Sequence, residues 1–256
     1  MSKSNLQQVW PEMNPEDLSP EQMALAALRH EIDLIDDEML ALFQKRLAIA
    51  AKVGLAKDAP HGPHTKLRPD REQTVLSRVL AKAEPDNATA VEGLWREIVG
   101  WGLAQQGKLQ VQVWAPVDPT RAFDGARHRF GSAATIRMVR DAQAALAFAA
   151  EGKGVAVLAV NTDDPWWVGL RRDWSSLSVF DGFGQAGGQP SSLAVGKIDP
   201  AALPKGRSVI VTAGGDAGDG GGARRWGLNT HHGWTLALTD AQLTPGDAEG
   251  CVGAIA

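Results

Sequence analysis

The chain has 256 residues, of which 44% are hydrophobic and 22% are charged, and this composition excludes an intrinsically disordered protein. The length allows one large domain or two modest ones. The net charge of -4 argues against a general nucleic-acid binder. Cys251 is the only cysteine, which excludes an intrachain disulfide and a cysteine metal cluster.

No apolar run approaches the roughly 20 residues that a membrane-spanning helix needs. The first ten residues lack the basic and apolar regions of a secretory signal. We therefore expect a cytoplasmic protein with no membrane association.

Residues 1–18 are polar and aperiodic, and we interpret them as a flexible N-terminal tail. A helix start follows, with Ser19 as the N-cap, Pro20 at the first helical position and Gln22 at the capping-box position. No proline occurs from there to Asp58, so we predict one helix of roughly 38 residues. Two further helices are predicted, over about 69–84 and 89–106.

After Gly107 the pattern changes to that of an α/β protein. Residues 109–114 alternate like a strand, residues 155–160 form a continuous apolar strand, and residues 208–212 are rich in β-branched side chains. Residues 136–150 are interpreted as an amphipathic helix between strands. We therefore predict an all-helical domain over 19–108 and a small α/β domain over 109–256, which is an α + α/β organisation.

The first predicted helix carries a heptad seam of apolar residues with charges placed in or near it. Arg46 stands in the seam itself, and Lys57 lies 11 positions on, nearly on the same face. For Arg46 alone, an arginine that reaches from the seam edge to water is the alternative. Arg29 lies about 100° around the helix from Arg46, so it cannot readily serve the same pocket from the same chain, but it could serve a pocket on a partner chain. The seam consists of Leu25, Leu28, Ile32, Ile35, Met39, Leu42, Ile49, Val53 and Ala56.

The other two predicted helices also carry polar groups on apolar stripes. Glu72 is in register with the apolar residues of 75–79, and Gly102 and Gln106 continue a stripe that passes through Trp95. Buried charge is costly unless it is paired or used. Two cations, one carboxylate and one amide facing the same core indicate a polar pocket that suits a small dianion carrying a hydroxyl.

At these residues the sequence closely resembles the all-helical class of chorismate mutase, over roughly residues 20–107. The version from Arg68 to Glu72 is most similar to mutase domains fused to prephenate dehydratase. The segments that carry the resemblance are 28–36, 45–46, 53–57, 68–72 and 95–106.

The resemblance implies an intertwined homodimer, in which three helices from each chain build two shared active sites. It implies that Arg46 binds one substrate carboxylate and that Arg29 of the other chain binds the second. Lys57 and Gln106 would hydrogen-bond the ether oxygen, and Glu72 would hold the ring hydroxyl. Two further residues are assigned in the same way: Arg71, which supports the hydroxyl end, and Gly102, whose backbone replaces a serine common in the family.

The implied reaction converts chorismate to prephenate in phenylalanine and tyrosine biosynthesis. This rearrangement takes place within one molecule, so the enzyme implied is an isomerase. It is concerted and needs no nucleophile, metal or organic cofactor. The enzyme holds the reactive conformer and stabilises the charge that grows on the ether oxygen. Gln105 is the alternative to Gln106 in the register of the last helix.

Residues 109–256 faintly resemble a prephenate dehydratase domain, at 111–116, 149–161 and 190–196. Pro190-Ser191-Ser192 stands where that family has Thr-Arg-Phe, and the span between the segments is too short for its second lobe. We therefore expect a degenerate domain with a regulatory or structural role and no dehydratase activity. The alternatives are a bifunctional mutase–dehydratase and a non-catalytic regulator that keeps the mutase fold.

Three weaker signals occur in the second half. His231 and His232 are adjacent on a predicted strand, where their side chains would point apart, so a metal pair is not expected. The glycine-rich segment 214–222 lacks the ending of a phosphate-binding loop and is interpreted as a flexible loop. Trp166 and Trp167 are expected in the core, with a contact to the helical domain as the alternative.

Overall fold

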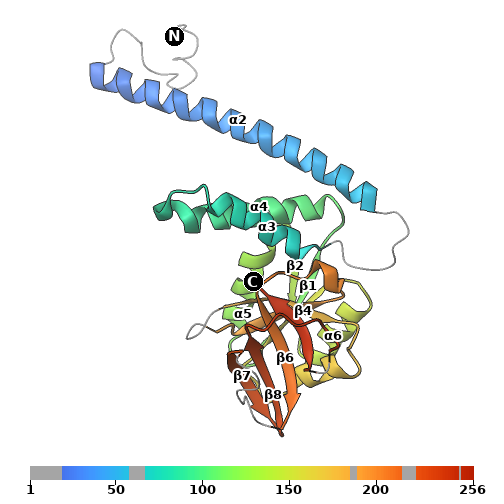
Figure 1. The fold of residues 1–256 in the computed structure, drawn as a ribbon. Coiled ribbons are helices and arrows are strands. Elements are labelled where there is room, and N and C mark those ends of the chain that lie inside the picture. Colours follow the sequence, from blue (N-terminus) through green and yellow to red (C-terminus); the bar gives the residue numbers. More distant parts are fainter. Residues whose placement is uncertain (1–18, 58–66, 185–188, 215–222, 248) are drawn as a thin grey trace. The chain divides into compact units, whose positions relative to one another are not determined.

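The computed structural model describes residues 19–57, 67–184, 189–214, 223–247 and 249–256 (Figure 1). The predicted tail, 1–18, lies outside the described residues. The chain forms two compact units, 1–49 and 50–256, and each is described by itself.

Helix α2 (Pro20–Lys57) begins where the sequence predicts. The Gln22 N–H donates to Ser19 Oγ at 3.3 Å, and the Ser19 N–H donates to Gln22 Oε1 at 2.8 Å. This reciprocal pair satisfies two backbone donors at the first turn, as in a capping box. The predicted seam is exposed in the single chain, with Leu28 and Leu42 at 57% and 65% exposure.

Helices α3 (Pro69–Leu80) and α4 (Ala88–Ala104) lie side by side in the second unit and are joined by a short 3₁₀ turn, η2 (Pro85–Asn87) (Figure 1). Helix α3 ends four residues before the predicted Glu84. Glu84 precedes a proline and adopts an extended conformation, with φ -61° and ψ 139°, because the proline ring disfavours helical geometry there.

The rest of the second unit is built on one nine-stranded mixed sheet, with strand order β2-β1-β3-β5-β4-β9-β6-β8-β7. Strands β2, β1 and β3 are parallel, whereas β5 is antiparallel to both of its neighbours. The strands are β1 (Gln110–Trp114), β2 (Thr135–Met138), β3 (Val155–Ala159), β4 (Ser178–Phe183), β5 (Ser192–Gly196), β6 (Arg207–Ala213), β7 (Arg225–His231), β8 (Trp234–Thr239) and β9 (Cys251–Ile255).

Helices α5 (Pro119–Phe130) and α6 (Ala142–Ala150) cover opposite faces of the sheet. Along β3, Val155 and Val157 face the core that includes α5, whereas Ala156 and Leu158 face the core that includes α6. This alternation is the period of two expected of a strand, and here both faces are buried. A helical region is thus followed by a part built on a mixed sheet.

The prediction of one helix over 136–150 is wrong in its first part. Residues 135–138 form strand β2, which pairs in parallel with β1, and helix α6 starts only at Ala142. Asp141 caps that helix by accepting hydrogen bonds from the N–H groups of Gln143 and Ala144. Isoleucine is found in both helices and strands, and here the pairing of Ile136 with the neighbouring strand β1 sets its extended conformation.

The tandem tryptophans lie in the core, as predicted. They belong to the 3₁₀ segment η3 (Trp166–Arg171), and their exposed fractions are 1% and 0%. The Trp166 Nε1–H donates to the carbonyl oxygen of Ala159 at 2.8 Å, which satisfies the buried indole.

Candidate active site

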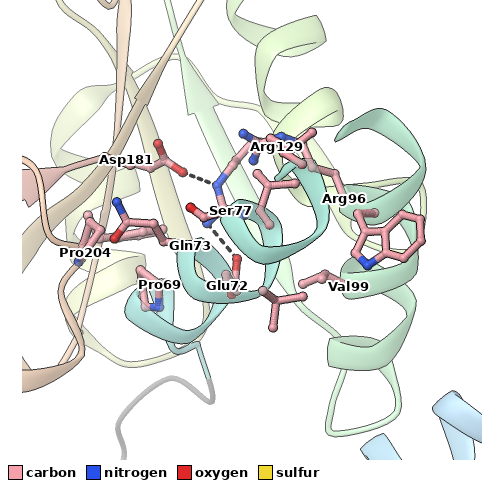
Figure 2. Close-up of a pocket in the computed structure, with 15 residues that line it drawn as sticks. Pro69, Glu72, Gln73, Ser77, Arg96, Val99, Arg129, Asp181 and Pro204 are labelled. Carbon is pink, nitrogen blue, oxygen red and sulfur yellow. Dashed lines mark hydrogen bonds and ion pairs between the residues drawn. The ribbon is translucent and has the colours of Figure 1, made fainter. Parts of the chain in front are cut away.

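A cavity of about 190 Å³ lies in the second unit between α3, α4, α5 and the sheet. The stripe predicted on α3, from Glu72 through Val75 and Leu76, forms one wall (Figure 2). Trp95, Val99 and Arg96 of α4 form another. The other lining residues are Pro69, Gln73, Ser77, Leu80, Arg129, Phe180, Asp181, Pro204 and Ala256.

Two carboxylates and one guanidinium meet at the wall of this cavity. Arg129 Nη2 lies 2.8 Å from Glu72 Oε2, and Arg129 Nε donates to Asp181 Oδ2 (Figure 2). Exposure of the Arg129 side chain is only 8%. Burial by itself would lower the pKa of the guanidinium, but the two carboxylates hold the pKa above its ordinary value. The guanidinium is therefore permanently charged, and the cluster carries a net charge of -1 when both carboxylates are ionised.

Each member of this cluster is fixed by its local structure. Glu72 stands in the first turn of α3, where the helix dipole favours a carboxylate. Asp181 follows an irregularity in the pairing of β4 with β5, and its Oδ1 accepts from the N–H of Gly182 at 2.8 Å. Arg129 stands in the last turn of α5 and lies over the ring of Phe130 at 5.0 Å.

The Glu72 carboxylate is not fully satisfied. Both of its oxygens are buried, and neither receives a well-directed hydrogen bond within the described part of the chain. The contact with Arg129 is therefore an ion pair at short distance whose hydrogen-bond geometry is poor. A buried carboxylate in this condition retains unused capacity to accept hydrogen bonds.

The other predicted site residues of the second unit do not line this cavity. Arg71, next to Glu72, is exposed. Gly102 is buried, and the half-buried Gln106 donates its Nε2–H to the Gly102 carbonyl oxygen at 3.3 Å. Glu72 is thus held beside Arg129 and Asp181, and the structure does not bring it together in one cavity with Arg71, Gly102 or Gln106.

The remaining predicted site residues belong to α2. Arg29 is exposed, and Arg46 is half-buried in the seam, where burial lowers the pKa of its guanidinium. Lys57 is the last residue of α2, and its side chain is not among those that the structure describes.

Sequence reasoning missed Arg129 and Asp181. Arg129 stands among the buried residues Ala122, Ala126 and Phe130 of α5, so a charge interrupts an apolar stripe there. The same signal identified Glu72. Asp181 gives no such signal, because its position depends on the pairing irregularity in β4.

The expectation that the two adjacent histidines point apart is wrong. Their ring centroids lie 4.1 Å apart, because His232 leaves strand geometry and adopts a positive φ of 47° in the β7–β8 turn. Among the described residues, no group of three or more histidine, cysteine or acidic side chains is placed to hold a metal. The expected loop 214–222 lies outside the described residues after Gly214.

Within the described ranges, no helix is long and apolar enough to cross a membrane. The cytoplasmic location stays a prediction.

Comparison with known proteins identifies the helical region. Residues 28–107 match the family model of chorismate mutase type II. The bifunctional chorismate mutase/prephenate dehydratases of Escherichia coli K12, E. coli O157:H7 and Shigella flexneri are each 33% identical over 100 residues. That alignment covers 38% of this chain and 25% of each relative, so the chain spans about a quarter of the length of the curated relatives that it matches. No solved structure matches the chain.

The family match ends at residue 107, before the first strand of the sheet. The dehydratase-like character of 109–256 and the domain boundary near residue 108 therefore stay predictions. The resemblance drawn from the helical segments is confirmed: residues 28–107 match the chorismate mutase type II family.

Proposed function

We propose that the chain is a chorismate mutase, an isomerase that converts chorismate to prephenate without a cofactor in phenylalanine and tyrosine biosynthesis. The observation that carries the proposal is the family match over 28–107, which contains every site residue inferred from the sequence. The buried Glu72 carboxylate beside a cavity supports it, since the substrate carries a ring hydroxyl for such an acceptor to bind.

In this mechanism Arg46 and the Arg29 of a second chain bind the two substrate carboxylates. Glu72 accepts the ring hydroxyl. The resemblance assigns Arg71 and the Gly102 backbone to the same pocket, although neither lines the cavity beside Glu72 in the single chain. These contacts hold the conformer in which the reacting carbons are close, a contribution from positioning.

Lys57 and Gln106 donate to the ether oxygen. Negative charge grows on that oxygen as the C–O bond breaks. Donors already in place stabilise the charge without reorganising, so their effect is larger at the transition state than in the bound substrate.

The active unit is a homodimer with two shared sites. The exposed seam of α2 supports this assembly, since eight of its large apolar side chains are 42–65% exposed in the single chain. A second copy of the same helix covers such a seam by heptad packing. The sheet-containing part has a regulatory or structural role and no dehydratase activity in this proposal.

The assignment of Gln106 is tested by Gln106→Glu, with Gln105→Glu as the matched control. As a carboxylate, Glu at 106 repels the charge that develops on the ether oxygen. As a neutral acid at low pH, it again donates a hydrogen. Loss of one such donor costs on the order of 10²–10³ in rate, so Gln106→Glu is expected to be slow at neutral pH and to recover as the pH falls.

Lys57→Ala is expected to be slow at every pH, because no titratable group replaces the lost donor. Gln105→Glu should follow the wild-type profile. If Gln105→Glu shows the acid-dependent recovery and Gln106→Glu does not, Gln105 and not Gln106 is the residue that donates to the ether oxygen. If the rates of both variants depend on pH as the wild-type rate does, neither glutamine donates to the ether oxygen.

A further inference from the structure

The ion pair between Glu72 and Arg129 joins the region matched to the mutase family with the part of the chain that the match leaves out. Glu72 belongs to α3, within 28–107, whereas Arg129 belongs to α5 and Asp181 to β4. A site residue of the proposed mutase is therefore contacted by a side chain that lies 57 positions away.

Two contacts fix Arg129, and a hydrogen-bonded contact with α4 supports the end of its helix. Asp181 accepts from Nε, and the Phe130 ring lies under the guanidinium. The segment that follows α5 is held on α4, because the Glu97 carboxylate accepts from the Ser132 N–H at 3.0 Å and from the Ser132 hydroxyl at 2.8 Å. Arg129 therefore presents Nη2 to Glu72 from a preorganised position, so little ordering is required when a ligand binds.

A purely structural ion pair would be expected to satisfy the whole carboxylate, since a buried ion pair stabilises a fold only when additional hydrogen bonds satisfy its remaining atoms. Glu72 departs from that expectation. The ion pair with Arg129 is formed at Oε2, and Oε1 is buried without a hydrogen-bond partner within the described residues. Glu72 lines the cavity, and Oε1, which neighbouring atoms cover in the single chain, is the carboxylate oxygen left without a donor there.

We propose that Arg129 is a positioning residue of the mutase site: its ion pair with Oε2 turns the Glu72 carboxylate so that Oε1 accepts the hydrogen of the substrate's ring hydroxyl. The inference rests on the proposed function. It also makes full mutase activity depend on the sheet-containing part, although every site residue inferred from the sequence precedes residue 107.

A double-mutant cycle tests this positioning role in the full-length chain. The variants are Arg129→Met, Glu72→Gln and the combination of both, and kcat/KM for chorismate is measured for each. Arg121→Met is the matched control, because Arg121 lies on the same helix and pairs at the surface with Asp118. All assays are run well below the lowest unfolding temperature of the set.

If Arg129 acts through Glu72, Arg129→Met should lower kcat/KM by on the order of 10- to 100-fold, the size expected when a catalytic group is misplaced. In the Glu72→Gln background the same substitution should then have little further effect, because the group that it positions is already lost. Arg121→Met should match the wild type.

Multiplicative losses, or an unchanged kcat/KM in Arg129→Met, would overturn the positioning role and leave the mutase assignment standing. A wild-type chain that does not consume chorismate would overturn both together. Should Arg129→Met fail to fold, Arg129→Lys replaces it. Lysine keeps the charge, but one ammonium cannot reproduce the two separate contacts from Nε and Nη2. It should reduce kcat/KM in the wild-type background only, and equal losses in both backgrounds would overturn the proposal.

Discussion

Two glycines on the same helix provide a matched pair for testing how α4 packs against the sheet-containing part. A Cβ added at Gly100 would lie 2.6 Å from the carbonyl oxygen of Phe130 and 3.5 Å from Cα of Gly131. These are backbone atoms, so a change of rotamer does not relieve the clash. A Cβ added at Gly93, two turns earlier, meets nothing within 4 Å.

Both Gly→Ala changes gain roughly 1 kcal/mol of helix propensity in α4. Overpacking at a closely packed contact costs about 1–3 kcal/mol. Because the propensity gain is common to the two variants, their difference isolates the packing cost. Gly93→Ala should thus stabilise the protein by up to about 1 kcal/mol, and Gly100→Ala should be about 1–3 kcal/mol less stable than Gly93→Ala.

Urea and thermal unfolding measure this difference directly. For a protein of this size, 1 kcal/mol corresponds to roughly 2–4 °C in Tm, so Gly100→Ala should unfold about 2–12 °C below Gly93→Ala. Equal stabilisation by both substitutions would refute the close approach of α4 to the end of α5. It would also remove the support that this contact gives to the position of Arg129.

Three further predictions concern the seam, the core and the cysteine. Leu42→Asp should dissociate the proposed homodimer in analytical ultracentrifugation, because it places a carboxylate in the apolar seam. The control Gln44→Asp, on the opposite side of the helix, should remain dimeric. A dimeric Leu42→Asp variant would contradict the seam assignment. Trp166→Phe should lower the free energy of unfolding by about 2–4 kcal/mol, since it leaves the buried carbonyl of Ala159 without the indole donor and opens a void. A loss below about 1 kcal/mol would contradict the hydrogen bond from the indole. Burial raises the pKa of the Cys251 thiol to about 11, so the thiol stays neutral at pH 8 and should react with a disulfide reagent only after unfolding; rapid labelling of the native protein would contradict its burial.

The elements predicted best are those fixed by local chemistry. The capping residues Ser19 and Gln22 set the start of α2, and the prolines at 69 and 85 bound α3 and its turn. Strands β1 and β3 were recognisable because their patterns of apolar residues are continuous or alternate over five residues. Strand β2 was not, because Ile136 acquires its conformation from the neighbouring strand.

The candidate site shows the same limit. Glu72 was predictable because a carboxylate on an apolar helical stripe needs a partner or a use. Its observed partner Arg129, and Asp181, which pairs with the same guanidinium, come from elements that only the tertiary fold brings to α3. Sequence periodicity identifies a buried charge on one helix, but it does not identify which distant side chain satisfies that charge.

Incubation of the full-length chain with chorismate tests the central claim most directly. The assay follows the loss of chorismate and identifies the product before and after acid treatment, which converts prephenate to phenylpyruvate. A chorismate mutase without dehydratase activity consumes chorismate and yields phenylpyruvate only after acid. Persistence of chorismate at high protein concentration would contradict the mutase assignment, and phenylpyruvate without acid would contradict the expected loss of dehydratase activity in residues 109–256.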